Sequence, residues 1–338
     1  LTFFLTIIAC YLLAQAKLIV ALPTSRGQHT QAIATSGGIA LFFTLLTLMT
    51  SFISVDSNII IFLSILGTIT LIGILDDIYN LGQILRLIIQ ILLSIIFTIN
   101  FITTTPLEAS LISFFIVYII NTINFIDGID LLASTQILFI LLSLLFVISA
   151  TALNHDSIPL PIISIINISI ISIIGFCIFN YPPASIFLGS SGAYYLGFLL
   201  ASIFAIIIST NMISIYTCLI LYSVPMVDTS TVLITRFFNK LKFEYNNTGH
   251  LIHSLIQSLK IIFFKPHSLH NYQIMAKKYN SHLTAGGIIL FINMIWYLPI
   301  AILSNIYPDF AQIMLFIAVI PYLIICIYNK TGIKEQNV

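Results

Sequence analysis

The chain has 338 residues, of which 59% are hydrophobic and 7% are charged, and its formal net charge is +1. In a water-soluble protein about a quarter of the residues are charged, so this composition excludes a soluble globular protein. Stretches of roughly 18 or more apolar residues are typical of transmembrane helices. We therefore predict an all-α integral membrane protein with about eleven such helices. They are expected at residues 1–20, 38–55, 58–75, 83–101, 109–122, 132–152, 159–179, 192–209, 211–235, 284–305 and 310–328.

The lysines and arginines predict the orientation of these helices. If the N-terminus lies outside and successive helices alternate in direction, all 12 basic residues fall in loops on one side. Basic loops are typical of the cytoplasmic side of a membrane, so the C-terminus is expected there. The longest of these loops spans about residues 236–283. No repeat of 20 to 50 residues is present, and residues 1–338 are interpreted as one polytopic domain with a cytoplasmic active-site face.

A polar loop precedes the second predicted helix. Residues 23–40 contain Arg26, His29 and a Gly37-Gly38 turn. Any loop that leads into a membrane helix could have this composition. The segment becomes informative because it is expected on the same side as the polar clusters that follow.

Two adjacent acids end the third predicted helix. Asp76 and Asp77 stand there, and Arg86 lies in the first turns of the fourth helix. Neighbouring carboxylates repel each other, which suits a divalent cation or a base with a raised pKa. A solvated helix end would give the same pattern, although ionisable groups near a membrane span are often functional.

Four polar residues are spaced three apart in NTINFIDGID, residues 121–130. They are Asn121, Asn124, Asp127 and Asp130. This spacing predicts that all four share one face of a helix. A stripe of hard oxygen ligands suits Mg²⁺ better than it suits apolar packing.

Two weaker clusters lie further along the chain. Residues 180–197 contain a Gly/Ser turn with Ser190 that opens a helix, where backbone N–H groups could bind phosphate; a simple tight turn is the plainer interpretation. In HLIH, His250 and His253 share a helical face within the long basic loop. Such a pair is usually an ordinary surface feature, but it would be cationic if it faced a phosphate.

Taken in order, these clusters resemble the motifs of the polyprenyl-phosphate N-acetylhexosamine-1-phosphate transferases, which form glycosyltransferase family 4. The similarity is strongest to the bacterial undecaprenyl-phosphate GlcNAc-1-phosphate transferases. NTINFIDGID is similar to the family signature Asn-x-x-Asn-Phe-x-Asp-Gly-x-Asp and is the most specific match. The other matching positions are Asp76, Asp77, Pro182, Pro183, Pro225, Asp228, His250 and His253.

The resemblance implies a reaction and its partners. N-acetylhexosamine 1-phosphate would pass from a UDP-sugar to a membrane polyprenyl phosphate with release of UMP, as the first step of a cell-envelope glycan such as lipopolysaccharide or a cell-wall polymer. Mg²⁺ (or Mn²⁺) would be the cofactor. The expected partners are the polyprenyl phosphate, the UDP-N-acetylhexosamine and the bilayer of a bacterial inner (plasma) membrane. No nucleic acid is expected, and a homodimer is left open.

The resemblance also implies roles for individual residues. The metal ligands would be Asn124, Asp127 and Ser190, of which Ser190 stands where the family has an aspartate. A hydroxyl brings no charge, so the metal would be held less tightly. The implied catalytic residues are Asp76, Asp77, His250 and His253, and the implied substrate-binding residues are Arg86, Asn121, Asp127 and Asp130.

Two alternatives remain open at this point. Besides Ser190, Ile252 stands where the family has a histidine and Ala21 where it has an aspartate. These three departures fit a degenerate family member that binds its substrates without turnover. Carboxylates near a membrane also mark ion pathways, which would indicate an ion-coupled transporter. A transporter should carry charges near the middle of its spans, and among these acids only Asp228 is expected there.

Overall fold

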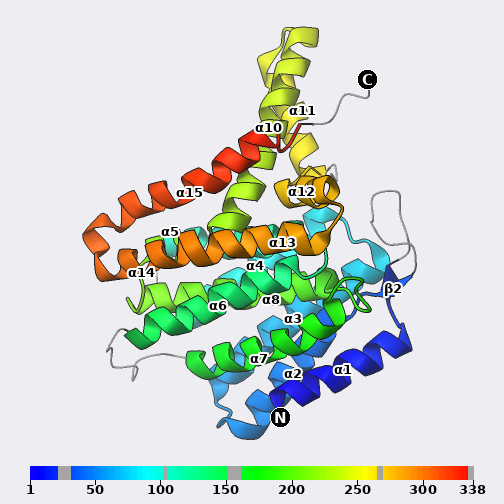
Figure 1. Cartoon of the computed structure of the whole chain (residues 1–338), viewed down its shortest axis with the longest axis vertical. Helices are drawn as coiled ribbons and strands as arrows, with labels where there is room; N and C mark the ends of the chain where they lie inside the picture. Colours follow the sequence, from blue (N-terminus) through cyan, green and yellow to red (C-terminus); the bar gives the residue numbers. More distant parts are fainter. Residues whose placement is uncertain (22–31, 103–104, 151–160, 265–268, 334–338) are drawn as a thin grey trace.

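The computed structural model describes residues 1–21, 32–102, 105–150, 161–264 and 269–333 (Figure 1). Nearly all of these residues are helical, so the predicted all-α membrane class is confirmed. One short antiparallel pair of strands, β1 (Val20–Ala21) and β2 (Ile33–Ala34), is present in the described part of the chain. Arg26, His29 and the first half of the predicted polar loop lie outside the described residues.

Within the described ranges, eight helices are long and apolar enough to cross a membrane, and a ninth is counted if a bent pair forms one span. The bent pair is α9 (Ile215–Leu221) with α10 (Ser223–Thr248), which meet at 76°. The eight are α3 (Ser57–Tyr79), α4 (Gln83–Phe101), α5 (Pro106–Ile126), α6 (Leu132–Ala150), α7 (Ile162–Asn180), α8 (Gly189–Ser209), the continuous run of α13 (His282–Ile292), η1 (Asn293–Tyr297) and α14 (Leu298–Ile306), and η2 (Pro308–Phe310) with α15 (Ala311–Tyr328).

The count of eleven spans is not confirmed. Each predicted segment contains an apolar helix, but the first two are short: α1 (Thr2–Ala16) has 15 residues and α2 (Gly37–Phe52) has 16. At about 1.5 Å per residue they reach roughly 24 Å, which is less than the hydrocarbon core of about 30 Å.

Helix α8 forms the core of the molecule and positions the site. It packs against α2, α3 and α5, and almost its whole length is buried (Figure 1). Close approach depends on a small residue, because a Cβ on Gly73 of α3 would overlap the backbone of Ser191 in the first turn of α8. The end of α3 and the start of α8 are therefore held together.

The predicted long loop at residues 236–283 is largely helical. Helix α10 runs on to Thr248, and α11 (Leu251–Phe264) packs back along it to form a hairpin that projects from the bundle (Figure 1). A third helix, α12 (Asn271–Tyr279), then leads into α13. The sequence has two weak helical patterns in this basic segment, and helices do form there.

Candidate functional site

A cavity of about 990 Å³ opens where the ends of several helices meet. Its wall comes from the end of α1, the strand pair, the ends of α3 and α5, the segment between α7 and α8, and the start of α13. The structure thus brings together polar groups that are far apart in sequence. Five predicted site residues line this cavity: Asp77, Asn124, Asp127, Asp130 and Ser190.

Asp127 is the C-cap of α5 and has the most perturbed carboxyl group of the cavity. Burial, and then the charges of Asp77 and Asp130, raise the pKa of Asp127 to about 8. Its carboxylate makes no hydrogen bond to the described part of the chain. A carboxyl group with a strongly perturbed pKa in a cavity is typical of a functional site.

Asp77 is held rigidly at the cavity wall. Its carboxylate accepts hydrogen bonds from the backbone N–H groups of Ser190 (2.8 Å) and Ser191 (3.1 Å). These N–H groups belong to the first turn of α8, which has no intrahelical acceptors for them. The Gly/Ser turn therefore binds a carboxylate of the protein itself, so these two amides are not free for a phosphate.

Asp76, one of the residues predicted to be catalytic, does not line the cavity. Its carboxylate lies 2.6 Å from Arg86 Nη1 and accepts a hydrogen bond of 3.0 Å from the Tyr194 hydroxyl. The same Arg86 nitrogen donates to Tyr194 at 2.9 Å, and Arg86, predicted to bind substrate, is also absent from the cavity wall. Successive side chains on a helix point about 100° apart, so only one of two adjacent acids faces the cavity.

Asn121 also turns away from the cavity. Its amide donates to Gln90 Oε1 at 2.7 Å and to the Val117 carbonyl at 2.8 Å, so it ties α5 to α4. The prediction that all four polar residues share one helical face is also wrong for Asp130, because α5 ends at Ile126 and Asp130 lies in the turn beyond it. A spacing of three drifts by about 60° per step on a helix, which carries Asn121 off the stripe.

The histidines of HLIH do not reach the cavity. His250 and His253 are exposed on the α10–α11 hairpin, and neither lines the cavity wall. Ile252, between them, is 74% exposed. The structure does not bring these predicted catalytic residues to the acids at the end of α5.

Two basic residues of the cavity wall were not predicted. Lys17 is the C-cap of α1, and His282 is the first residue of α13. The imidazole Nδ1 of His282 lies 3.2 Å from Asp130 Oδ2. A histidine at the start of an apolar helix has no distinctive local pattern, so its pairing with Asp130 could not be read from the sequence.

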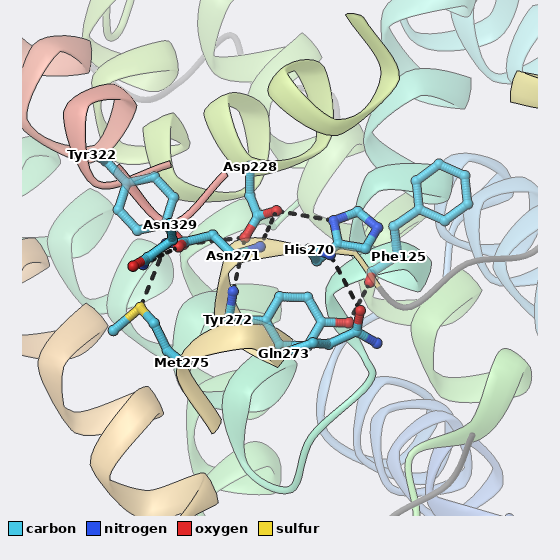
Figure 2. A network of polar contacts seen from close by, with 9 residues as sticks. All are labelled: Phe125, Asp228, His270, Asn271, Tyr272, Gln273, Met275, Tyr322 and Asn329. Atoms are coloured by element: carbon cyan, nitrogen blue, oxygen red, sulfur yellow. Dashed lines mark hydrogen bonds and ion pairs between the residues drawn. The ribbon is translucent and has the colours of Figure 1, made fainter. Parts of the chain in front are cut away.

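Asp228 lies outside the cavity and organises α12 (Figure 2). One carboxylate oxygen contacts His270 Nδ1 at 2.9 Å and accepts from the Asn271 N–H at 3.1 Å. The other accepts from the Tyr272 N–H at 3.3 Å and from the Tyr322 hydroxyl at 3.1 Å. This buried carboxylate therefore caps the N-terminus of α12 and joins α10, α12 and α15.

Helix α12 in turn contacts the polar turn at the end of α5. The Tyr272 hydroxyl donates to the Phe125 carbonyl at 2.7 Å, in the last turn of α5 (Figure 2). Burial, then the charges of Asp228 and Asp127, raise the pKa of Tyr272 well above its ordinary value, so the hydroxyl stays protonated as a donor. A Cβ on Gly128 would overlap this hydroxyl, which explains the glycine in the turn.

Comparison with known proteins covers the helices that carry most of the cavity's polar residues, α3, α5 and α8. Residues 58–210 match the family model described as Glycosyl transferase family 4. The chain is 28% identical over 251 residues to the probable undecaprenyl-phosphate N-acetylglucosaminyl 1-phosphate transferase of Bacillus subtilis, covering 69% of this chain and 68% of the relative. It is 28% identical over 181 residues to the undecaprenyl-phosphate alpha-N-acetylglucosaminyl 1-phosphate transferase of Thermotoga maritima, covering 52% of each.

Proposed function

Because this chain belongs to glycosyl transferase family 4, we propose that it transfers N-acetylhexosamine 1-phosphate from a UDP-sugar to a polyprenyl phosphate. The observation that carries the proposal is the convergence of Asp77, Asn124, Asp127 and Asp130 on one cavity at the ends of membrane helices. A lipid phosphate and a water-soluble nucleotide sugar can meet only at such a boundary. The two relatives are named for the same type of transfer to undecaprenyl phosphate.

In the proposed reaction, an oxygen of the lipid phosphate attacks the β-phosphorus of the UDP-sugar in line. The new bond joins that oxygen to phosphorus, the bond from the β-phosphorus to the bridging oxygen breaks, and UMP leaves with the electron pair. A phosphate monoester is largely ionised at neutral pH, so the protein needs to position the nucleophile rather than remove a proton. We assign this positioning to the side of the cavity where Asp77 is fixed by two N–H groups.

The acids of the cavity fit a Mg²⁺ or Mn²⁺ ion. Within the described residues no three His, Cys, Asp or Glu side chains form a ready-made metal cage, but Mg²⁺ is usually bound by one or two carboxylates together with water and substrate phosphates. Asp77, Asp127 and the amide oxygen of Asn124 would hold it, with the Ser190 hydroxyl beside them. The bound ion would neutralise the diphosphate and the charge that develops during transfer.

We place the protein in a bacterial inner (plasma) membrane, with the N-terminus outside and the cavity and C-terminus on the cytoplasmic side. If the eleven predicted helices all cross the membrane, all 12 lysines and arginines fall on one side, which supports this orientation. UDP-sugars are made in the cytoplasm, so the donor would reach the cavity from there. The product would serve as the first lipid intermediate of a cell-envelope glycan such as lipopolysaccharide or a cell-wall polymer.

A transfer assay tests the proposal directly. The full chain, purified in detergent, is incubated with labelled UDP-GlcNAc, undecaprenyl phosphate and Mg²⁺. We expect labelled lipid and UMP in equal amounts, no product without the lipid, and no product after chelation of the metal. Release of UDP instead of UMP would indicate transfer of the sugar alone. Absence of any product, with UDP-GlcNAc or with another UDP-N-acetylhexosamine, would indicate a non-catalytic family member.

The raised pKa of Asp127 predicts a pH-dependent metal requirement. With a pKa of about 8, Asp127 holds its proton in the metal-free protein near neutral pH, and a metal must displace that proton to bind. As the pH rises from about 6.5 to about 8.5, the Mg²⁺ concentration for half-maximal turnover should fall about 25-fold. Asp127→Asn should remove this difference. An equal requirement at both pH values in the native protein would exclude Asp127 from the metal site.

A further inference from the structure

The pair formed by His282 and Asp130 sets one side of the cavity apart from the metal-binding side. We infer that His282 is a positioning residue for the donor: it orients Asp130 to bind hydroxyl groups of the UDP-sugar. The inference rests on the proposed function, and it concerns a residue outside the segments that suggested that function. In this arrangement Asp130 binds the neutral part of the donor, and Asp77 and Asp127 serve the reacting phosphates.

His282 contacts Asp130 at two points. Its Nδ1 lies 3.2 Å from Asp130 Oδ2 and 3.3 Å from the Asp130 backbone N. The imidazole side chain is 19% exposed and that of Asp130 is 11% exposed, so both are largely shielded but open to the cavity. When Nδ1 carries a proton it can donate to Oδ2, and when it does not it accepts from the Asp130 N–H; either contact keeps the imidazole against Asp130, and the contact to Oδ2 fixes the Asp130 side chain.

His282 is itself held in position by the corner between α12 and α13. Ser281 caps α13, because its hydroxyl accepts a hydrogen bond of 3.1 Å from the Thr284 N–H, and its own N–H donates to the Ala276 carbonyl of α12 at 3.1 Å. Asp228 anchors the other end of α12 (Figure 2). The α12–α13 unit thus contacts the turn at the end of α5 twice, through Tyr272 and through His282.

The three acids of the cavity differ in the partners that the protein gives them. Asp77 is bound by two backbone N–H groups and Asp130 by a basic side chain, whereas burial and then the charges of these two acids raise the pKa of Asp127. A carboxylate paired with an imidazole has less need of a metal, and it repels phosphate oxygens. It is well suited to accept hydrogen bonds from hydroxyl groups.

Two parts of the donor offer such hydroxyls, the ribose and the hexosamine. Both carry neighbouring hydroxyl groups that a fixed carboxylate can bind through its two oxygens. Comparing UDP with UDP-GlcNAc separates them. A defect with both ligands assigns Asp130 to the ribose, and a defect with UDP-GlcNAc alone assigns it to the hexosamine.

The test measures binding of UDP and UDP-GlcNAc to the full chain in detergent by calorimetry, in the presence of Mg²⁺. His282→Leu should weaken binding by roughly tenfold or more, as expected when a hydrogen-bonded charged group loses its partner. His282→Asn should stay within about threefold of the native affinity, because its amide N–H lies where Nδ1 was. Leu283→Ala is the control, since Leu283 is exposed next to His282 and does not line the cavity.

A double-mutant cycle decides whether His282 acts through Asp130. If it does, His282→Leu adds nothing to Asp130→Asn, whereas additive losses would overturn the inference. Native affinity in His282→Leu would overturn it as well. If His282→Leu does not fold, His282→Asn should bind better than His282→Gln, whose N–H lies nearer to Nε2, and equal binding would overturn the inference. Failure of the native protein to bind UDP at all would overturn the proposed function with it.

Discussion

Replacing Asp77 by asparagine should lower the rate of transfer by about a hundredfold or more, as is typical of groups that act at a transferring phosphoryl. Asp77 reaches the cavity, and the N–H groups of Ser190 and Ser191 fix its carboxylate at 2.8 and 3.1 Å. The variant keeps the shape of the side chain but removes the charge, and its NH₂ group would oppose one of the two N–H donors. Turnover of the purified variant under saturating substrates measures the effect.

The matched control is the neighbouring substitution Asp76→Asn. Asp76 is 6% exposed and paired with Arg86 at 2.6 Å, so this change should cost folding stability, by about 2 kcal/mol, instead of acting on the reacting groups. The resemblance implied a catalytic role for both acids. Near-normal turnover in Asp77→Asn, or a stable but inactive Asp76→Asn, would reverse the two assignments.

The difference between these two acids shows what the sequence could and could not predict. Composition and hydrophobic runs were sufficient for an all-α membrane protein, because lipid leaves few other ways to satisfy the backbone. Spacing also identified NTINFIDGID as a site segment, and Asn124, Asp127 and Asp130 line the cavity. The rotation of α3 that turns Asp77 toward the cavity and Asp76 toward Arg86 depends on packing against α8, which no local pattern records.

Long-range partners were also beyond the sequence. His282 meets Asp130 across 152 positions, and Asn121 meets Gln90 across 31. A single histidine or glutamine at such a position is indistinguishable from an ordinary polar residue until the helices are assembled. HLIH shows the converse. Helical spacing and resemblance indicated a site there, whereas in the structure α10 and α11 pair with each other and His250 and His253 are exposed, away from the cavity wall.

Asp228 is the position at which the sequence and the structure lead to the most different expectations for a mutation. An acid within an apolar segment is functional by default and is compatible with an ion pathway. In the structure it is 1% exposed, and backbone N–H groups, a histidine and a tyrosine hydroxyl surround both of its oxygens (Figure 2). These contacts describe a structural cap for α12.

Asp228→Asn should therefore unfold the protein more readily. The amide places an NH₂ donor against groups that are themselves donors, and the charge that strengthens these hydrogen bonds is lost, so the expected cost is about 3 kcal/mol. Thermal unfolding in detergent measures it. Tyr322→Phe removes one of the donors to Asp228 and leaves the others, so it should cost only about 1 kcal/mol.

The Asp228→Asn variant also separates the transferase interpretation from the transporter interpretation. If Asp228 anchors α12, then loss of stability in Asp228→Asn should be accompanied by weaker donor binding, because Tyr272 and His282 are carried by the unit that it anchors. If Asp228 belonged to an ion pathway, its neutral variant should be at least as stable as the native protein, since a buried charge would have been removed. Native stability in Asp228→Asn together with an altered response to ions would contradict the anchoring role and favour the pathway.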